Sequence, residues 1–247
     1  MSIAEKGLIL KVINSKESDR SLVILTEHGL VSAYAKSARN IKNKKFAATS
    51  QFCYTDFVFF EGKDMYIVDE AAGIEVFFEL RSDIERLALA QYFCELLIAV
   101  TPESSDSEDF LRLSLNALKF LCDSTKNIDL IKSVYELKLM CFAGFMPDIT
   151  ACSVCGTYED REMLFNIEES ILYCSQCENK APYGSVKLNQ SMLAIMRHIV
   201  FSDFNKIFNF TASCENLAAV SQLCEKYVEA KVERHFKTLD FYYSVKV

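Results

Sequence analysis

Two different hydrophobic periods divide the sequence near residue 80. Before that point, short apolar runs such as 22–25 and 52–60 are rich in β-branched and aromatic residues and alternate with polar stretches. Runs of this length and spacing predict five or six strands, arranged as a small barrel or a sandwich. A closed barrel would leave no strand edge exposed.

From residue 82 onward, apolar positions recur every three or four residues, which is typical of helices with one buried face. Ser82 followed by Glu85 has the pattern of a capping box, and Gly144 with Pro147 has the pattern of a helix end. We expect helices at about 82–100, 108–122, 128–144, 189–202 and 214–236. The fold class is therefore α+β, with a β domain at 1–80 and a mainly helical domain at 81–247.

The composition is that of an ordinary globular protein, with 51% hydrophobic and 25% charged residues among 247. The apolar run near the N-terminus is short and contains Lys11, which does not suit a signal peptide. No stretch approaches the roughly 20 apolar residues that span a bilayer. We therefore expect a cytoplasmic protein without a membrane partner. Its ten cysteines should then act as metal ligands and core residues rather than form disulfides.

Four of the cysteines form two close pairs, in the order C-x2-C, eighteen residues, C-x2-C. This spacing is typical of zinc ribbons, in which two tight turns direct four thiolates at one ion. Gly156, directly after the first pair, suits such a turn, and 163–174 can form a hairpin between the pairs. We predict one structural zinc ion in a finger at about 148–184. Its ligands are Cys152, Cys155, Cys174 and Cys177.

A catalytic role for this zinc is not expected, because catalytic zinc usually keeps one coordination position open and four cysteines leave none. Zinc deaminases share a C-x2-C pair but also need an H-x-E segment and a proline before the pair. Here Ala151 and Tyr173 precede the two pairs, and no histidine begins H-x-E. The common phosphate-binding and hydrolase motifs are also absent from the sequence. We predict that the protein is not an enzyme.

The net charge of −7 argues at first against a nucleic-acid partner, but its distribution is uneven. Residues 1–80 carry 10 basic and 11 acidic groups, whereas 81–247 carry 17 and 23. Within the first part, segment 36–45 (KSARNIKNKK) holds five cations and no acid, close in sequence to several aromatic residues. Small barrels bind single strands through such cations and stacking aromatics. The alternative is a solvated loop. The candidate DNA-binding residues are Lys36, Arg39, Lys42, Lys44 and Lys45, with Arg20 as a weaker candidate.

Two segments together resemble the bacterial RecO family of recombination mediators. One is LTEHGLVSAYAKSARNIKNKK (25–45) and the other is FAGFMPDITACSVCG (142–156). The resemblance follows the order of elements along the whole chain and is specific at these two places. Lys36 and Arg39 match the family pattern A-K-G-A-R, in which Ser37 replaces the glycine, and the paired cysteines match the zinc ligands.

The resemblance implies an N-terminal OB-fold barrel, then an α-helical domain with an inserted four-cysteine zinc finger. It implies binding of single- and double-stranded DNA and annealing of complementary strands. It also implies work with RecR, and often with RecF, to load the recombinase RecA on DNA coated by single-strand binding protein (SSB). Contact with the acidic C-terminal tail of SSB and a cytoplasmic, nucleoid-associated location follow as further expectations. Lys132 and Lys138 would either receive that tail or lie on a solvated helix face.

Two other classes of function stay open at this point. One is a zinc-ribbon protein-interaction module without a nucleic-acid role, in which the basic segment binds an acidic protein. The other is an enzyme that uses a cysteine or a carboxylate, which would require a cleft with a strongly perturbed titratable group.

Overall fold

The structure of the chain is a computed structural model that describes residues 2–63, 65–102 and 106–246. It forms two compact units, which we describe separately. The first contains residues 1–123 and 236–247, and the second contains residues 124–235.

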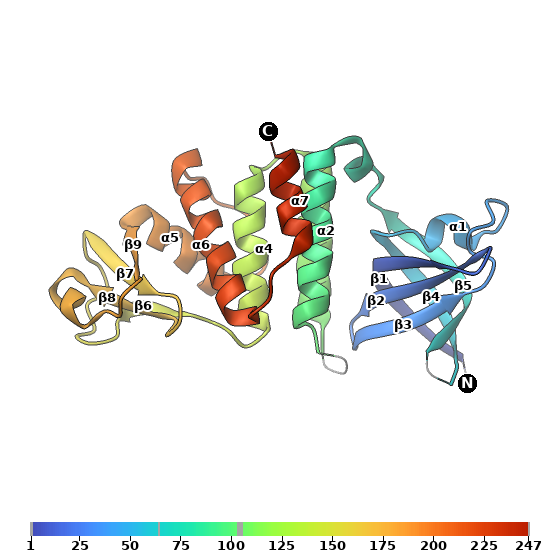
Figure 1. Cartoon of the computed structure of the whole chain (residues 1–247), viewed down its shortest axis with the longest axis horizontal. Helices are drawn as coiled ribbons and strands as arrows, with labels where there is room; N and C mark the ends of the chain where they lie inside the picture. The colour runs from blue at the N-terminus through green and yellow to red at the C-terminus, as the bar shows by residue number, and fades with distance from the viewer. Residues whose placement is uncertain (1, 64, 103–105, 247) are drawn as a thin grey trace. The chain divides into compact units, whose positions relative to one another are not determined.

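Five strands in the first unit form a closed barrel in the order β1-β2-β3-β5-β4 (Figure 1). Neighbouring strands are antiparallel, except that a short parallel pairing between β3 and β5 closes the barrel. The strands are β1 (Ser2–Ser15), β2 (Asp19–Thr26), β3 (Gly29–Ala35), β4 (Cys53–Glu61) and β5 (Tyr66–Val76). Of the two predicted arrangements, the barrel is therefore confirmed and the sandwich is not.

The barrel core is apolar, and buried positions alternate with more exposed ones along most of β4, as expected for a strand with one face in the core. Ile9, Ile24, Phe57 and Phe59 are almost completely buried, and the two phenylalanine rings stack with their centroids 5.0 Å apart. A short helix, α1 (Lys45–Ala48), contacts β4 and β5. A five-stranded barrel of this kind agrees with the expected OB-fold.

Three helices complete the first unit: α2 (Ile84–Val100), α3 (Glu108–Asp123) and α7 (Lys237–Val245). A 3-10 helix, η1 (Phe78–Ser82), precedes α2. The N-cap of α2 is Asp83, whose carboxylate accepts from the backbone N–H of Arg86 at 3.1 Å, so the expected capping by Ser82 is wrong. Ser82 ends the 3-10 helix, which shifts the start of α2 by one residue.

Helix α7 was not expected from the sequence, which predicted one helix over 214–236. That helix ends earlier because Glu233 adopts a left-handed conformation with φ 51°. The chain then begins α7, which packs against α2. Phe236 meets the ring of Tyr92 edge-on, and Thr238 donates its hydroxyl to Glu95 at 2.6 Å. Phe236 and α7 therefore stabilise the first unit.

The second unit combines three helices with a four-stranded sheet in the order β6-β8-β7-β9 (Figure 1). The helices are α4 (Ile128–Phe142), α5 (Gln190–Phe201) and α6 (Cys214–Val232). The strands are β6 (Asp148–Cys152), β7 (Glu162–Asn166), β8 (Ile171–Cys174) and β9 (Val186–Asn189), with a 3-10 helix, η2 (Ser175–Lys180), after β8. The α+β fold class is thus confirmed, including the predicted hairpin, formed by β7 and β8.

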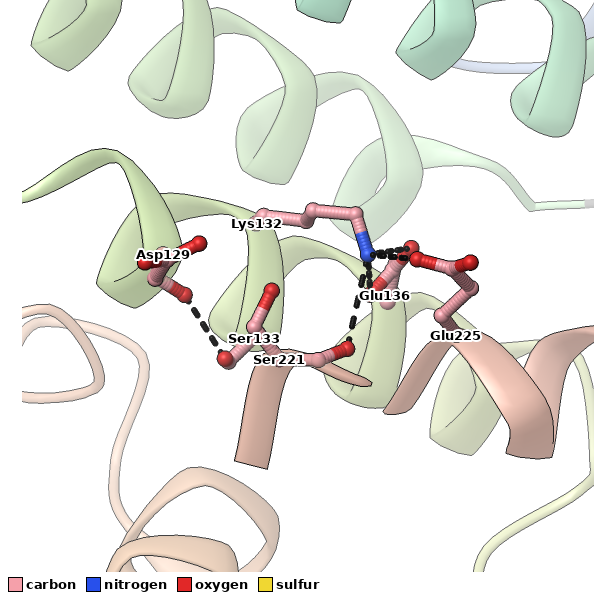
Figure 2. Close-up of polar contacts among 6 residues, drawn as sticks. All are labelled: Asp129, Lys132, Ser133, Glu136, Ser221 and Glu225. Carbon is pink, nitrogen blue, oxygen red and sulfur yellow. Dashed lines mark hydrogen bonds and ion pairs between the residues drawn. The ribbon is translucent and has the colours of Figure 1, made fainter. Parts of the chain in front are cut away.

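Helices α4 and α6 share a buried ion-pair network (Figure 2). The Nζ atom of Lys132 lies 2.9 Å from carboxylate oxygens of both Glu136 and Glu225. Lys132 and Glu136 are fully buried, and the side chain of Glu225 is 20% exposed. Lys132 therefore neither lies on a solvated face nor can receive an acidic tail. The same correction holds for Lys138, which is buried and donates to the carbonyl of Val200 at 2.9 Å.

We predict that Lys132→Met lowers the free energy of unfolding by about 3–5 kcal/mol, because the buried carboxylate of Glu136 loses its cation. Adding Glu136→Leu to that variant should recover most of the loss, since the carboxylate left between α4 and α6 is then that of Glu225, which is partly exposed to water. Urea unfolding followed by circular dichroism measures both values. Lys226→Met, at an exposed lysine of α6, is the control and should change stability by less than about 0.5 kcal/mol. Equal stability of Lys132→Met and the wild type would contradict the network's role.

Candidate functional site

Segment 36–45 forms the loop between β3 and α1, and we call it the basic loop (Figure 1). Its backbone makes consecutive turns. The N–H of Asn40 donates to the carbonyl of Ser37 at 3.2 Å, and the N–H of Asn43 donates to the carbonyl of Asn40 at 2.8 Å. The side chains of Asn40 and Asn43 also accept from the N–H groups of Lys42 and Lys45. The loop therefore has a defined conformation, although its sequence is mostly polar and cationic.

The carboxylate of Asp19 anchors the start of the basic loop. It accepts from the hydroxyl of Tyr34 at 2.5 Å and from the backbone N–H of Ser37 at 2.7 Å. The hydrogen bond from Tyr34, followed by that from Ser37, lowers the pKa of Asp19 below its usual value. The charged form therefore holds the loop against β2.

A second set of contacts joins the basic loop to the turn between β1 and β2. The backbone N–H of Arg39 donates to the carbonyl of Ser18 at 2.9 Å, and its guanidinium donates to the carbonyl of Glu17 at 3.1 Å. The same turn carries Lys16, whose ammonium group lies 5.8 Å from the centroid of the Tyr34 ring. Lys16 thus extends the cationic surface, although the sequence offered no sign of it, since only the strand pairing places the two loops together.

The six predicted cations differ in how far their charged groups are already engaged. Lys36, Lys42 and Lys44 are exposed, and in the described part of the chain no hydrogen bond or ion pair holds their ammonium groups. Lys45 is half-buried and donates to the carbonyl of Val68 at 3.0 Å. The exposed Arg39 uses part of its guanidinium for the turn described above. Three lysines are therefore fully available for an anion.

Arg20 contributes mainly to the structure of the barrel. Its guanidinium donates to the carbonyl of Phe46 at 2.8 Å and to the hydroxyl of Thr49 at 2.9 Å, and it lies 5.0 Å from the centre of the Phe46 ring. Burial, together with the charges of Arg39 and Arg81, lowers the pKa of Arg20 from its usual value. Arg20 therefore holds the end of the basic loop and α1 in place, and its predicted contact with DNA stays a prediction.

The aromatic residues near the basic loop are only partly available for stacking. Phe52 is 3% exposed and belongs to the core, whereas Tyr34, Phe46 and Tyr54 are half-buried. Tyr34 is held by Asp19, and Phe46 by the guanidinium of Arg20. None of these four rings stands free in solvent.

The two cysteine pairs meet at one point in the second unit. The four sulfur atoms of Cys152, Cys155, Cys174 and Cys177 all lie within 4.8 Å of one another. Cys152 ends β6 and Cys174 ends β8, so the β7–β8 hairpin carries the second pair back to the first. Gly156 has φ +75° and donates its N–H to the carbonyl of Cys152 at 2.9 Å, which closes the first turn. Left-handed backbone of this kind favours glycine.

The arrangement of these thiols suits a tetrahedral metal ion. The sulfurs of Cys155 and Cys174 are 3.5 Å apart, close to the roughly 3.8 Å that metal–sulfur bonds of about 2.3 Å would give. Hydrogen bonds from Thr157 lower the pKa of Cys155 to about 6, whereas burial and the neighbouring cysteines raise the pKa of Cys177 to about 12. Four thiolates at this distance repel one another, and a bound cation would neutralise them. The cluster can therefore hold a metal ion.

Arg197 on α5 connects the metal site to the helices. Its guanidinium donates to the carbonyls of Ile149, Thr150 and Tyr158 at 2.7–2.8 Å and lies 4.1 Å from the centre of the Tyr158 ring. These carbonyls flank the first cysteine pair on both sides. No pattern in the sequence predicts this role, because Arg197 follows the pair by more than forty residues.

Profiles of one protein family match the chain in two consecutive parts. "Recombination protein O N terminal" matches residues 1–77, and "Recombination protein O C terminal" matches residues 81–240. The chain belongs to the RecO family. The resemblance seen in the two sequence segments is thus confirmed over nearly the whole chain.

Relatives in the RecO family match this chain from end to end. "DNA repair protein RecO" of Acetivibrio thermocellus is 32% identical over 237 residues, which are 95% of this chain and 94% of the relative. The protein of the same name from Alkaliphilus metalliredigens is 29% identical over 242 residues, which are 97% and 98% of the two chains. The chain is therefore a DNA repair protein by family.

No helix in the described part is long and apolar enough to cross a membrane.

Ser37 replaces the glycine of the RecO pattern and has φ +54°, in the left-handed region. We predict that Ser37→Gly is tolerated, with a change in unfolding free energy within about 1 kcal/mol, because relief of strain and added chain entropy oppose each other. Ser37→Val should cost about 1–2 kcal/mol, since a β-branched residue is disfavoured there. Thermal unfolding measures both variants. A Val variant as stable as the Gly variant would show that the loop does not require this conformation.

Proposed function

We propose that this RecO-family protein is a non-enzymatic mediator of recombinational repair that binds DNA with its barrel and anneals complementary strands. The single observation that carries the proposal is the basic loop, where three exposed lysines have ammonium groups unengaged within the described residues and no acid interrupts the segment. In the proposed division, residues 1–80 bind single- and double-stranded DNA and residues 81–247 serve other contacts. The net charge of −6 over 81–247 supports this division.

Annealing by this protein would require no bond chemistry. Lys36, Lys42 and Lys44 would neutralise phosphates on a strand and release condensed counterions. Reduced repulsion between two strands raises the rate at which they meet. Because phosphate contacts carry no sequence information, the loop would act on strands of any sequence.

We propose zinc as the ion of the four-cysteine site, with a structural role. Four thiolates complete the tetrahedral shell that zinc prefers and leave no position for a substrate or water. When bound, the ion would neutralise the thiolates and fix the two turns. Cys152 and Cys174 end strands, so the ion would hold the β6 and β8 ends together, and Arg197 would transmit this order to α5.

The partners implied by the family are also part of the proposal. They are RecR, often RecF, and the C-terminal tail of SSB, from whose coated single strands the protein would help to load the recombinase. Burial removes Lys132 and Lys138 as receivers of the acidic tail, so the tail would bind other residues. A cytoplasmic, nucleoid-associated location would follow from DNA binding.

We predict that replacing Lys36, Lys42 and Lys44 together by Glu abolishes salt-sensitive acceleration of annealing. Two complementary labelled oligonucleotides are mixed with the protein, and the annealing rate is followed over a salt series. The wild type should accelerate annealing most at low salt, because counterion release drives binding. The variant should lose this acceleration because its loop would repel phosphates.

The matched control changes three exposed lysines elsewhere, Lys6, Lys63 and Lys226, to Glu, which gives the same change in net charge. It should anneal strands nearly as fast as the wild type. Equal losses in both variants would mean that net charge matters and the loop does not. No acceleration by the folded wild type at low salt would favour the alternative, a zinc-ribbon protein-interaction module without a nucleic-acid role.

For the metal site, we predict that Cys152→Ser lowers zinc content and the melting temperature while low-salt DNA binding by the barrel is retained. The reason is that structural zinc contributes its binding energy to folding, and the four cysteines lie in the second unit. Metal analysis and calorimetry measure the effect, and Cys214→Ser, at an exposed cysteine outside the cluster, is the control. An unchanged melting temperature and zinc content in Cys152→Ser would show that the cluster is not a zinc site.

A further inference from the structure

The most exposed large apolar side chain described in the first unit lies at the tip of the basic loop. Ile41 is 82% exposed, whereas the next most exposed, Phe78, is 63% exposed and has the guanidinium of Arg81 over its ring. The other exposed apolar residues of this unit lie in strands, helices or their ends. Ile41 therefore contributes little burial to the folded barrel.

Local structure does not require an isoleucine at this position either. Ile41 and Lys42 are the two central residues of the turn that the N–H of Asn43 closes onto the carbonyl of Asn40. Central turn positions are usually filled by Gly, Pro, Asn, Asp or Ser, and a β-branched residue offers the turn no hydrogen bond. The side chain of Asn40 already accepts from the N–H of Lys42 inside the turn, and that of Asn43 accepts from the N–H of Lys45 just after it.

The turn holds Ile41 in a fixed position relative to the cations. Asn43 also donates its side-chain amide to the carbonyl of Ser37 at 3.1 Å, which ties the tip to the anchored start of the loop. Lys42 follows Ile41 directly, and Lys44 lies two residues further on. The result is an apolar tip of fixed position, bordered by charged groups that are available for phosphates.

We infer that Ile41 contacts the face of an unstacked nucleobase while the neighbouring lysines hold the phosphates of the same strand. This inference rests on the proposed function, because it requires that the basic loop binds DNA. A single strand presents an apolar base face within reach of each phosphate, whereas a duplex stacks its base faces against one another. Minor-groove binding proteins insert apolar side chains, including isoleucine, between the base steps of duplexes, which shows that an isoleucine can pack against the face of a base.

An aliphatic contact also fits annealing better than a hydrogen-bonding one would. Isoleucine has no donor or acceptor in its side chain, so it cannot read the hydrogen-bonding groups that distinguish the bases. The contact is small, so a base can leave it when a complementary strand arrives. Tyr34 is engaged with Asp19 and Phe46 with Arg20, whereas Ile41 is 82% exposed and therefore better placed for this role.

The test compares two labelled probes of equal length: an oligothymidylate, and an oligomer of abasic residues with the same phosphates. Ile41→Ser should bind the oligothymidylate about fivefold more weakly than the wild type, with an unchanged dependence on salt. Both proteins should bind the abasic oligomer equally. Lys42→Ala should weaken both probes alike and reduce the salt slope by about one.

Two further variants make the result specific to the tip. Ile41→Phe should bind the oligothymidylate at least as tightly as the wild type, because an aromatic ring stacks on a base. Ile74→Ser, at a half-exposed isoleucine of β5, is the matched control and should bind both probes like the wild type. All variants should keep the melting temperature, since neither isoleucine is in the core.

Several outcomes would overturn the inference. Equal binding of the oligothymidylate by Ile41→Ser and the wild type would do so, and so would an equal loss on both probes, which would mean that Ile41 only shapes the loop. If Ile41→Ser kept its DNA affinity but lost binding to phosphatidylglycerol vesicles, the tip would be a membrane contact instead. If the wild type bound neither probe in a salt-sensitive way, the proposed function itself would fail, and this inference with it.

Discussion

The cationic surface of the barrel depends on one carboxylate. Five cations within ten residues repel one another, and without contacts to the barrel this repulsion would favour a disordered loop. Asp19 provides the anchor by accepting from both Tyr34 and Ser37, which fixes the loop where it leaves β3. Because the Asp19 carboxylate accepts hydrogen bonds from these neutral donors, it orders the loop without forming an ion pair with the lysines. The positive charge is therefore concentrated and still available.

Most of the architecture followed from simple patterns in the sequence. The change of hydrophobic period near residue 80 predicted strands before it and helices after it, and the spacing of the cysteines predicted that their sulfurs meet. These features depend on neighbours close in sequence, which a single chain reveals. The helix ends were predicted less well. Ser82 was mistaken for the cap that Asp83 provides. The sequence prediction also joined α7 to α6, because the left-handed residue between them is Glu233, and glutamate does not signal a helix end as glycine does.

The functional residues were predicted only as far as composition allows. The basic segment was visible as a charge run, but the run did not show that Lys45 and Arg20 have structural partners or that Lys16 joins from another turn. Lys132 and Lys138 were misjudged for a related reason. A lysine on a helix is usually solvated, and the burial of these two becomes evident only from partners far along the chain, Glu225 for Lys132 and Val200 for Lys138.

The path of the chain through the first unit determines the order in which the protein is completed during synthesis. The barrel, α2 and α3 are made before the second unit, whereas α7 is made after it, and its neighbour Phe236 packs beside Tyr92. The second unit lies wholly between these segments, so it can finish folding while the first still exposes an apolar face of α2. Such a face is prone to aggregation, and a chain cut before Phe236 would expose it permanently.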